Sequence, residues 1–483
     1  MPLTRRTALA ATAAGAAGAA GALAGATVRP EPAAAAVADY VIRHDQPRQT
    51  ILGLGVEIQS DSIGSGNNGL PTATTSVPHD LVASERTRMY TDLLKIRDDR
   101  GFRYLRLALG LYLRGLDSTQ KQIIGRWPTQ LAELAELIAV SGIEGVSAEY
   151  WSPAPGWKSN GSYVGGTIAS TDPGWLDQYG DAIVRDLAYL RDNGVPVKMF
   201  SLQNEPSIDY VAYSCCSYSN DQYYKAFKAI APKIRAEFPG IFIHADAENG
   251  QRGRGGALIR ADATALSQVD GWSFHRIGSD SNDQLQNNYT SDAAGKPVFS
   301  NEFEYQVPTS DWKMVNTAQS IMNWMTFQNS PTWFWLHALK PTYNSEASGY
   351  SLGFWRPYDD DDFTKYPNIA KGHWDYNPRN FNGIHGFVKY LPWNSVRYHV
   401  DEGTQRTEQR IMAWKTPQGK LVFAMTNRSL STVTYTVDTG STRAFQGQQY
   451  TPTARNTNLT DKTGPVLTLT LPPTSVQFWI ERL

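Results

Sequence analysis

A glutamate ends a short apolar run in the middle of the chain, at a position that packing alone would not give to a charged residue. The run is Val197–Leu202, and Gln203–Pro206 follows it, with Asn204 and Glu205 at its centre. Charged side chains are rarely buried unless they are paired or functional, so a strand that ends in Glu205 indicates a site that needs a carboxylate. The structural alternative is a salt bridge at the rim of the fold.

A second glutamate ends a later apolar run in the same way, because Val298–Ser300 leads through Asn301 to Glu302. Two carboxyl groups beside a sugar are what glycoside cleavage requires: one protonates the leaving oxygen and the other attacks the anomeric carbon. Carboxyl groups about 5–5.5 Å apart give retention, whereas a separation of about 6.5–9.5 Å gives inversion. Glu304 shares a face with Glu302 by the two-residue period of a strand, and Glu302 is preferred because it ends the apolar run.

The elements that must position these glutamates follow from a regular alternation between about residues 50 and 390. Short apolar runs alternate there with amphipathic helical patterns, for example at Leu131–Val140, Leu176–Arg191 and Tyr223–Phe238. This alternation predicts a parallel (β/α)8 TIM barrel, whose strands are buried on both faces and whose active site lies at their C-terminal ends. The eight runs predicted as strands are Leu52–Gln59, Tyr104–Leu109, Gly145–Tyr150, Val197–Leu202, Ile241–Ala245, Gly271–His275, Val298–Glu302 and Thr332–Leu336.

After about Trp393 the sequence changes to short β-branched segments separated by turn residues, a pattern typical of an antiparallel β-sandwich. The segment Tyr40–Arg43 also has the pattern of a strand and is expected to join that sheet. The predicted domains are an N-terminal strand at 39–50, a catalytic barrel at 51–392 and a C-terminal sandwich at 393–483. The predicted sandwich strands are Val396–Val400, Arg410–Lys415, Lys420–Asn427, Ser431–Val437, Val466–Leu471 and Ser475–Glu481.

Residues 1–38 have the composition of a targeting segment. Arg5 and Arg6 precede a weakly apolar Ala/Gly run, and the small residues Ala36–Ala38 offer a cleavage site before Asp39. A paired arginine ahead of such a run is typical of a twin-arginine export signal. The run is too poor in leucine and isoleucine for a membrane span, so we expect a secreted protein with no membrane in its mature form.

The charge balance excludes some classes of partner. The chain has 45 basic and 46 acidic residues without a block of like charges, so neither nucleic acid nor a membrane surface is expected as a partner. The two cysteines, Cys215 and Cys216, are adjacent, and a strained vicinal disulfide and two thiols remain alternatives. No zinc-like spacing of histidines and acidic residues accompanies them, so neither a metal nor another cofactor is expected.

Five stretches of the sequence follow one another in the order of a known family: Gln49–Gly55, Trp151–Lys158, Gln203–Pro206, Lys296–Glu302 and Leu469–Val476. Together they span nearly the whole mature chain and resemble glycoside hydrolase family 30, within the clan of (β/α)8 retaining glycosidases. The Asn-Glu-Pro element in Gln203–Pro206 is shared across the clan, whereas the Trp-Ser-Pro loop in Trp151–Lys158 and the split sandwich narrow the likeness to the family. The resemblance implies that Glu205 is the general acid/base and Glu302 the nucleophile of a cofactor-free glycosidase.

The chemistry of the residues agrees with these roles. Glu205 must carry a proton near neutral pH, so its surroundings are expected to raise its pKa. Once the charge of Glu302 is lost to the glycosyl bond, Glu205 can ionise and act as the base. Asn204 is expected to donate a hydrogen bond to the 2-hydroxyl of the sugar, an interaction that strengthens in the transition state.

Other candidate substrate-binding residues end predicted strands or directly follow them. Arg106 is expected to pair with the nucleophile, because a charge inside a barrel is costly unless it is paired. His275 resembles the rim histidine of the clan, with a purely structural role as the alternative. Trp335 is expected to lie beneath the sugar, with core packing as the alternative. Trp151 is expected to line the subsite of the non-reducing-side sugar, and Tyr305 is added from the segment after the second glutamate.

Two acidic residues depart from the pattern of the family. Glu57 stands in strand one where glycine or alanine is common, and Glu149 stands near the loop tryptophan where small residues or proline are usual. Either they bind hydroxyl groups of the sugar, or they pair with Arg103, Arg114 or Arg276. Arg276 is also a candidate for binding an acidic sugar. Because Glu57 and Glu149 depart from the family pattern, the identity of the sugar and its linkage stay open.

The sequence therefore predicts a secreted retaining glycosidase that acts on an oligosaccharide, a polysaccharide or another glycoside with a β-linkage. One alternative is a transglycosylase that uses the same two glutamates. The other is a carbohydrate-binding protein without catalysis, which would be expected to lack one of the two carboxylates.

Overall fold

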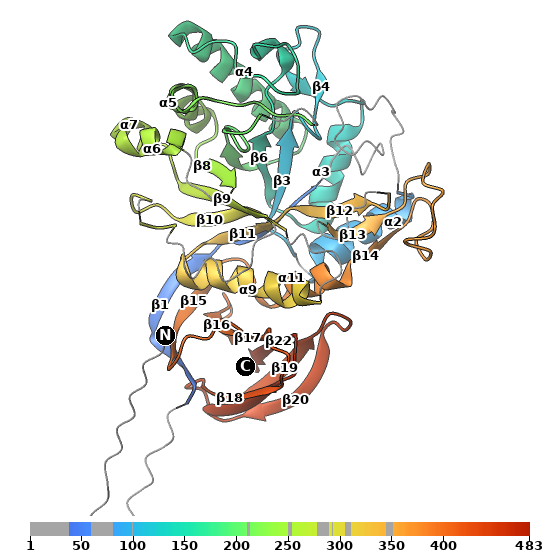
Figure 1. Cartoon of the computed structure of the whole chain (residues 1–483), viewed down its shortest axis with the longest axis vertical. Helices are drawn as coiled ribbons and strands as arrows, with labels where there is room; N and C mark the ends of the chain where they lie inside the picture. The colour runs from blue at the N-terminus through green and yellow to red at the C-terminus, as the bar shows by residue number, and fades with distance from the viewer. Residues whose placement is uncertain are drawn as a thin grey trace, which may run out of the picture. The chain divides into compact units, whose positions relative to one another are not determined.

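The computed structural model describes residues 38–58, 81–98, 100–209, 213–249, 254–277, 289–291, 293–304, 311–343 and 351–483. Eight parallel strands in these ranges form a closed barrel (Figure 1). They are β2 (Gly53–Glu57), β3 (Tyr104–Leu109), β6 (Gly145–Tyr150), β7 (Val197–Ser201), β8 (Phe242–Asn249), β9 (Gly271–Ile277), β10 (Val298–Glu304) and β11 (Thr332–Trp335). Because β11 pairs back with β2, the predicted barrel is confirmed, with all eight predicted runs as its strands.

Two layers of side chains fill the inside of the barrel. Tyr104, Met199, Phe299 and Phe334 form an apolar cluster, in which the rings of Tyr104 and Phe334 stack with their centroids 6.1 Å apart. Side chains two residues apart on a strand point the same way. Arg106 therefore lies one layer above Tyr104, towards the C-terminal ends of the strands. The apolar layer closes the bottom of the barrel, and the layer above it is free to be polar.

Helices cover the outside of the barrel, and their sequences explain their positions. Helix α5 begins with a capping box, in which Ser219 and Gln222 each bind the backbone N–H of the other with a side-chain oxygen. Helix α4 buries Leu176, Ile183 and Leu187 along one side. The helices are α2 (Ala83–Arg88), a wider helical segment at Met89–Lys95, α3 (Gln130–Ser141), α4 (Pro173–Asp192), α5 (Asn220–Glu237), α6 (Arg254–Ala261), α7 (Ala263–Leu266), α9 (Trp312–Phe327) and α11 (Pro378–Tyr390).

A nine-stranded sheet forms the second part of the fold. Its order is β20 (Thr457–Thr463), β19 (Ala444–Tyr450), β22 (Ser475–Glu481), β17 (Leu421–Asn427), β16 (Gln409–Lys415), β15 (Ser395–Glu402), β1 (Tyr40–Ile51), β18 (Val433–Asp438) and β21 (Val466–Leu471). Strand β1 pairs antiparallel with β15 and parallel with β18, so the N-terminal strand joins the C-terminal sheet as predicted. Phe423 of one half and Leu469 of the other belong to one apolar cluster, which makes the sheet sandwich-like.

Helices α9 and α11 join the barrel to the nine-stranded sheet. The ring of Phe387 in α11 meets the ring of Phe478 in β22 edge-on, with the centroids 5.0 Å apart. Gln319 Nε2 in α9 donates a hydrogen bond of 3.1 Å to Thr426 Oγ1 in β17. Most of α9 is buried, including its polar residues, because it packs against both the barrel and the sheet.

The sequence pattern did not predict three features of the fold. Strand β20 is an edge strand with mostly exposed residues, and β19 carries glutamines and a glycine, so neither shows the apolar alternation of a strand. An insertion after β11, residues 337–377, forms a third sheet from β12 (His337–Pro341), β13 (Ser351–Trp355) and β14 (Trp374–Tyr376). A short hairpin of β4 (Gly115–Leu116) and β5 (Ile123–Ile124) follows β3.

Some sequence predictions concern residues outside the described ranges. Residues 1–37, with most of the predicted export signal, and Tyr305 are among them. In the part of the chain that the structure describes, no helix is long and apolar enough to cross a membrane. Cys215 and Cys216 are both buried as thiols, and burial raises the pKa of the Cys216 thiol to about 12.

The contact between α11 and the sheet predicts the effect of a single added methyl group. A Cβ at Gly386 would lie 2.2 Å from the ring of Phe478, whereas a Cβ at Gly174 in α4 would meet nothing within 4 Å. We expect Gly386→Ala to lower the free energy of unfolding by about 1–3 kcal/mol through overpacking. Gly174→Ala, the matched control, should be neutral or stabilising by up to about 1 kcal/mol. Urea denaturation measures both, and equal stability of the two variants would contradict the packing described.

Candidate active site

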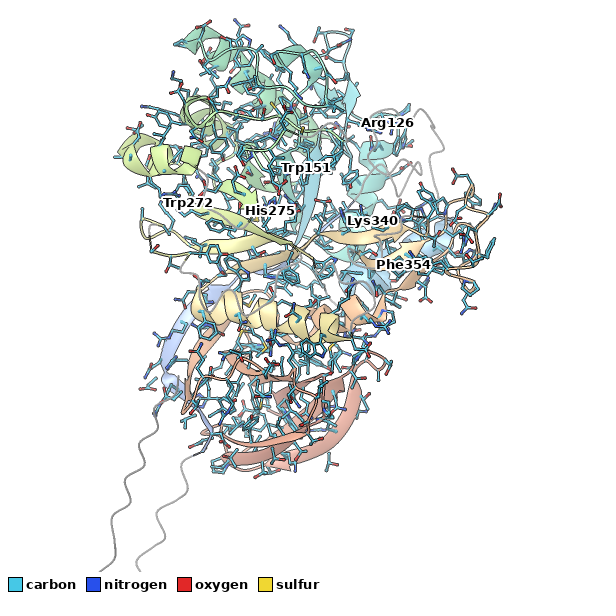
Figure 2. The ribbon with its side chains drawn as sticks, in the orientation of Figure 1. Arg126, Trp151, Trp272, His275, Lys340 and Phe354 are labelled. Carbon is cyan, nitrogen blue, oxygen red and sulfur yellow. The ribbon has the colours of Figure 1, made fainter. Side chains whose placement is uncertain are left out.

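Side chains from five barrel strands, and from the segments after β6 and β7, meet at the C-terminal mouth of the barrel. Trp151 and His275 mark this place in Figure 2. The carboxyl groups at the mouth are almost completely buried, with Glu302 the most exposed of those that contact Arg106, at 6 %. The predicted residues that the structure brings together here are Glu57, Arg106, Glu149, Trp151, Asn204, Glu205, His275 and Glu302.

The guanidinium group of Arg106 binds three carboxyl groups. Its Nε donates a hydrogen bond of 2.6 Å to Glu149 Oε2, and its Nη1 donates to Glu57 Oε2 at 3.2 Å. The same Nη1 also donates to Glu302 Oε2. All four side chains are buried, so these contacts are stronger than the same contacts would be in water. The predicted pairing of Arg106 with the candidate nucleophile is therefore present in the structure.

The remaining N–H groups of Arg106 face Asn204 and His275. Its Nη2 donates to Asn204 Oδ1 at 2.7 Å and lies 3.4 Å from His275 Nε2. The guanidinium carbon lies 4.3 Å from the centroid of the Trp151 ring, which covers one face of the planar group. An arginine has five N–H donors, and every one of these has a partner at the barrel mouth. The geometry of Arg106 thus orients Asn204 and His275 as well as the carboxylates.

His275 lies between the two glutamates that the sequence singles out. Its Nδ1 is 3.1 Å from Glu205 Oε1 and 3.7 Å from Glu302 Oε2. Because Nε2 of the same ring faces Arg106, a neutral His275 carries its hydrogen on Nδ1, directed towards Glu205. The two carboxylate oxygens can be no further apart than the sum of the two distances, about 6.8 Å, which accommodates the narrow separation of a retaining pair.

The backbone around Glu205 is strained and firmly held. Glu205 has a φ of +43°, in the left-handed region that few non-glycine residues adopt. Its N–H donates to Ala247 O at 3.0 Å, and the N–H of Asn204 donates to Tyr150 O at 2.7 Å. Gln203 Nε2 adds a bond of 2.8 Å to Trp151 O. Strain of this kind persists where the surrounding structure determines it, and it is common at functional sites.

A β-bulge in β10 places two side chains of consecutive residues in the site. The pairing of β10 with β9 shifts between Ser300 and Glu302, which leaves Asn301 as the extra residue. Asn301 is buried and its Nδ2 donates to Glu149 Oε2 at 3.2 Å, while Glu302 turns to Arg106. Because Phe299 lies inside the barrel, strict alternation would turn Asn301 inward and Glu302 outward, and the bulge brings Glu302 in beside Asn301. Sequence reasoning selected Glu302 as the end of the apolar run and did not select Asn301.

Glu248 is a second residue that sequence reasoning missed. It lies near the end of β8, after a bulge in which Asp246 and Ala247 have positive φ angles. Its carboxylate accepts hydrogen bonds from the N–H of Ser207 at 3.0 Å and from Ser207 Oγ at 2.8 Å. Burial raises the pKa of Glu248, and the nearby charge of Glu205 adds to the rise. The segment Ala245–Asn249 has no long apolar run before the glutamate, which is the signal that identified Glu205 and Glu302.

The environment drives the buried carboxyl groups to different protonation states. Burial raises the pKa of Glu302, but the charges of His275 and Arg106 outweigh it, so the net pKa is lowered and Glu302 is ionised. For Glu57 burial dominates, and although Arg106 opposes it, the charge of Glu302 adds to a pKa well above the ordinary value. Glu57 therefore keeps its proton to a higher pH than a glutamate in water does. Burial lowers the pKa of His275, yet Glu302 and Glu205 together raise it above its ordinary value.

Glu57 and Glu149 share an arginine partner that sequence reasoning did not select for them. Both pair with Arg106, which is none of the three arginines predicted as their partners. Arg103 pairs with Glu144 at the edge of the barrel. The side chains of Arg276 and Glu304 lie outside the described residues.

Trp335 lies away from this site. Its ring packs against Phe303 and Trp333 with centroids 5.9 and 6.4 Å away, and it has no exposed surface. The neighbouring Phe334 belongs to the cluster inside the barrel, so the alternation of the strand turns Trp335 outwards. The alternative of core packing therefore describes Trp335, and its indole has no face on which a sugar could stack.

Among the residues that the structure describes, no group of histidine, cysteine and acidic side chains has the arrangement of a metal site. The carboxyl groups at the barrel mouth contact Arg106 and His275 instead.

Solved structures with the same architecture cover nearly the whole chain. A glycoside hydrolase family 30 subfamily 8 xylanase from Clostridium acetobutylicum has 16% sequence identity and a TM-score of 0.69, over 92% of this chain and 100% of the xylanase. The catalytic domain of a family 30 xylanase from Talaromyces cellulolyticus has 14% identity and a TM-score of 0.68, over 92% and 100% of the two chains. An endo-β-1,6-glucanase has 15% identity and a TM-score of 0.66, over 92% and 94%.

The chain has the fold of glycoside hydrolase family 30. The likeness includes the nine-stranded sheet as well as the barrel, because the matched length exceeds the barrel alone. No protein-family model and no curated protein matches the sequence. The resemblance read from the motifs is thus confirmed at the level of the fold, and the activity is argued from the site itself.

The central position of Arg106 predicts a large loss of stability when its charge is removed. Arg106→Met leaves Glu149 and Glu302 buried without a counter-charge, so we expect the free energy of unfolding to fall by about 3–5 kcal/mol. Arg191→Met is the control, because Arg191 forms ion pairs with Asp192 and Glu237 on the surface, at 42% exposure. Its loss should cost at most about 1 kcal/mol. A similar, small loss in both variants, measured by denaturant unfolding, would contradict the role of Arg106.

The raised pKa of Glu57 predicts how stability depends on pH. Above the ordinary pKa of 4.5, the unfolded chain releases the proton of Glu57 while the folded protein keeps it. This residue therefore makes stability fall with rising pH, by up to about 1.4 kcal/mol per pH unit, until the folded pKa is reached. Glu57→Gln removes the effect, so the stability of the variant relative to wild type should rise as pH increases above 4.5. Parallel stability curves for the two proteins would show that Glu57 is ionised in the fold.

Proposed function

We propose that the protein is a retaining glycosidase that cleaves β-glycosidic bonds, with Glu205 as general acid/base and Glu302 as nucleophile. The observation that carries the proposal is the position of His275 Nδ1, 3.1 Å from one glutamate and 3.7 Å from the other. It holds one oxygen of each carboxyl group beside a single ring nitrogen, which supports double displacement, at strand ends where barrel enzymes carry out their chemistry.

In the first step Glu302 attacks the anomeric carbon. Its lowered pKa keeps it ionised, and its hydrogen bond from Arg106 holds it against rotation. Glu205 gives its proton to the leaving oxygen as the glycosidic bond breaks, so that the negative charge of the pair moves from Glu302 to Glu205. The product is a glycosyl ester on Glu302 and a free alcohol.

In the second step a water molecule replaces the ester. Glu205, now a carboxylate, takes a proton from the water as its oxygen attacks the anomeric carbon, and Glu302 leaves as a carboxylate. His275 Nδ1 lies within reach of both glutamates, so it faces the negative charge before and after each step. Its fixed position stabilises the transferred charge without any movement of the ring.

Asn204 is placed to bind the sugar. Its Oδ1 accepts the hydrogen bond from Arg106 Nη2, which directs its NH2 group away from the guanidinium. That NH2 group is then available for the 2-hydroxyl of the sugar in the active site, as expected from the sequence. Trp151 is 95% buried and its ring covers Arg106, so little of its surface is open to a sugar.

The fold is compatible with more than one linkage, because the compared structures include xylanases and an endo-β-1,6-glucanase. We propose that the substrate is an oligosaccharide, a polysaccharide or a smaller glycoside, and that residues 1–38 direct the protein out of the cell as a twin-arginine signal. A transglycosylase would use the same first step, with a sugar hydroxyl in place of water in the second.

Substitution of the two glutamates tests the proposal. With a nitrophenyl β-glycoside that the wild type hydrolyses, Glu302→Gln should reduce turnover to background, and azide should restore Glu302→Gly with a product of inverted configuration. Glu205→Gln should reduce turnover about 10²–10⁴-fold for substrates with poor leaving groups. NMR of the first-formed product gives its anomeric configuration.

Glu304→Gln is the matched control, two residues from the nucleophile on the same strand. It should keep its activity, subject only to local effects on binding. Full activity of Glu302→Gln together with loss in Glu304→Gln would overturn the choice of nucleophile. A first-formed product of inverted configuration from the wild type would overturn the double-displacement mechanism.

A further inference from the structure

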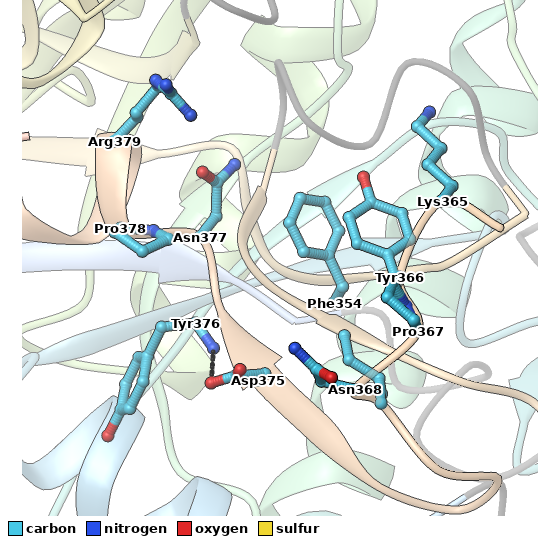
Figure 3. Close-up of a pocket in the computed structure, with 11 residues that line it drawn as sticks. Phe354, Lys365, Tyr366, Pro367, Asn368, Asp375, Tyr376, Asn377, Pro378 and Arg379 are labelled. Atoms are coloured by element: carbon cyan, nitrogen blue, oxygen red, sulfur yellow. Dashed lines mark hydrogen bonds between the residues drawn. The ribbon is translucent and has the colours of Figure 1, made fainter. Parts of the chain in front are cut away.

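The proposed mechanism does not use the pocket of about 320 Å³ in the insertion at 337–377 (Figure 3). Phe354 in its wall is only 5% exposed, and its ring packs on the ring of Tyr366 with the centroids 4.5 Å apart, so it has no open face for a ligand. A residue without a role in the mechanism lies instead at the barrel mouth. It is Glu248, whose carboxyl group binds the segment that carries Glu205.

Two consecutive residues of β8 bind the short segment from Glu205 to Ser207. The N–H of Glu205 donates to Ala247 O at 3.0 Å. Two residues further on, the N–H of Ser207 donates to Glu248 Oε1 at 3.0 Å, and its hydroxyl donates to Glu248 Oε2 at 2.8 Å. Pro206, between them, has no N–H of its own. Both N–H groups that this segment possesses are therefore bound to β8.

A bulge in β8 makes this double contact possible. The pairing of β8 with β9 shifts between Asp246 and Glu248, and Asp246 and Ala247 have φ angles of +76° and +50°. In a regular strand the side chains stand perpendicular to the sheet, whereas here the carbonyl of Ala247 and the side chain of Glu248 reach the same segment. Helix α6 supports the bulge, because Arg260 Nη1 donates to Asp246 Oδ2 at 3.1 Å. A Cβ at Gly256 in α6 would lie 1.8 Å from Asp246 Oδ1, so the helix packs closely on the bulge.

The contact with Glu248 helps to hold a strained turn. The φ of +43° at Glu205 costs about 1–3 kcal/mol and persists only where the surroundings determine it. Ser207 is exposed, but the carboxyl group that it binds belongs to a residue only 6% exposed. A hydrogen bond in such surroundings is stronger than one in open solvent. Glu248 is therefore suited to keep the turn after Glu205 in one conformation.

The conformation of this turn matters because the carboxyl group of Glu205 must be placed accurately. Its Oε1 lies 3.1 Å from His275 Nδ1, and a general acid must lie within hydrogen-bond reach of the leaving oxygen. A displacement of about 1 Å can lower the rate about 10²-fold. Glu248 is also close enough to Glu205 for the charge of Glu205 to be among the causes of its raised pKa.

We propose that Glu248 is a positioning residue for the general acid/base. By binding Ser207 it fixes the turn that follows Glu205, and it thereby holds the carboxyl group of Glu205 beside His275, within reach of the leaving oxygen. This role rests on the proposed glycosidase function. Loss of Glu248 is then expected to impair proton donation more than the attack by Glu302.

The test compares two substrates that differ in their need for an acid: an oligosaccharide that the wild type cleaves, and a dinitrophenyl β-glycoside of the same sugar. Dinitrophenolate leaves without a proton, whereas a sugar hydroxyl needs one. We expect Glu248→Ala to lower kcat/KM for the oligosaccharide by about 10–100-fold. The loss for the dinitrophenyl glycoside should be about tenfold smaller. Glu248→Gln, whose amide oxygen can still accept the N–H of Ser207, should recover most of the activity.

Three further variants separate positioning from a loss of stability. Asp262 at the start of α7 also accepts two backbone N–H groups, at 2.8 and 3.2 Å, so Asp262→Ala should lower stability without changing the ratio of the two kcat/KM values. In Glu205→Gln, which lacks the acid, the addition of Glu248→Ala should cause no further loss on the oligosaccharide. If Glu248→Ala does not fold, Ser207→Ala, which removes one of the two hydrogen bonds, should change the ratio in the same direction to a smaller degree.

Equal losses on the two substrates, no loss on either, a further loss in the Glu205→Gln background, or a Glu248→Gln variant as impaired as Glu248→Ala would overturn the positioning role and leave the glycosidase proposal intact. If the wild type hydrolyses no glycoside, the glycosidase proposal fails instead, and a crystal structure of Glu248→Ala decides on the positioning role. A Glu205 that keeps its φ of +43° and its 3.1 Å contact with His275 overturns the role, and a displaced Glu205 supports it.

Discussion

The arrangement of the barrel mouth depends on one buried guanidinium group. Arg106 directs all five of its N–H donors to side chains that come from other strands or strand ends, and Trp151 covers one of its faces. Burial of a charge is unfavourable unless hydrogen bonds and opposite charges replace the lost water. Each strand that contributes a partner is therefore held in register with β3, and a shift of any one of them would leave a buried donor or carboxylate without a partner.

The same network assigns different chemistry to similar residues. Glu57 and Glu302 both contact Nη1 of Arg106, yet the pKa of Glu57 is raised and that of Glu302 is lowered, because Glu57 is fully buried beside the charge of Glu302, whereas His275 lies beside Glu302. Glu205 stands on strained backbone across His275 from Glu302. The transfer of negative charge between two glutamates, which the proposed mechanism needs, is then a short displacement past a fixed imidazole.

Most of the barrel could be predicted from the order of the residues, because strands that are buried on both faces have continuous apolar sequences. The residues that were missed lie where this regularity fails. Glu248 follows a bulge in β8, and the bulge in β10 leaves both Asn301 and Glu302 in the site, because a bulge reverses the alternation on which the assignment of faces relies. Trp335 is the opposite case. Its place at a strand end suggested that its side chain faces the barrel mouth, but the alternation of the strand turns the side chain outwards into the core.

Residue types and their spacing were sufficient to indicate the reaction. Glutamates that end apolar strands are rare for energetic reasons, and two of them on parallel strands of one barrel must come to the same end. The partners of Glu57 and Glu149 could not be inferred in this way. They depend on contacts between residues far apart in the chain: Arg106 meets side chains 43 to 196 residues away. Packing in three dimensions selects such partners among several equally charged candidates. The local sequence does not show which candidate is selected.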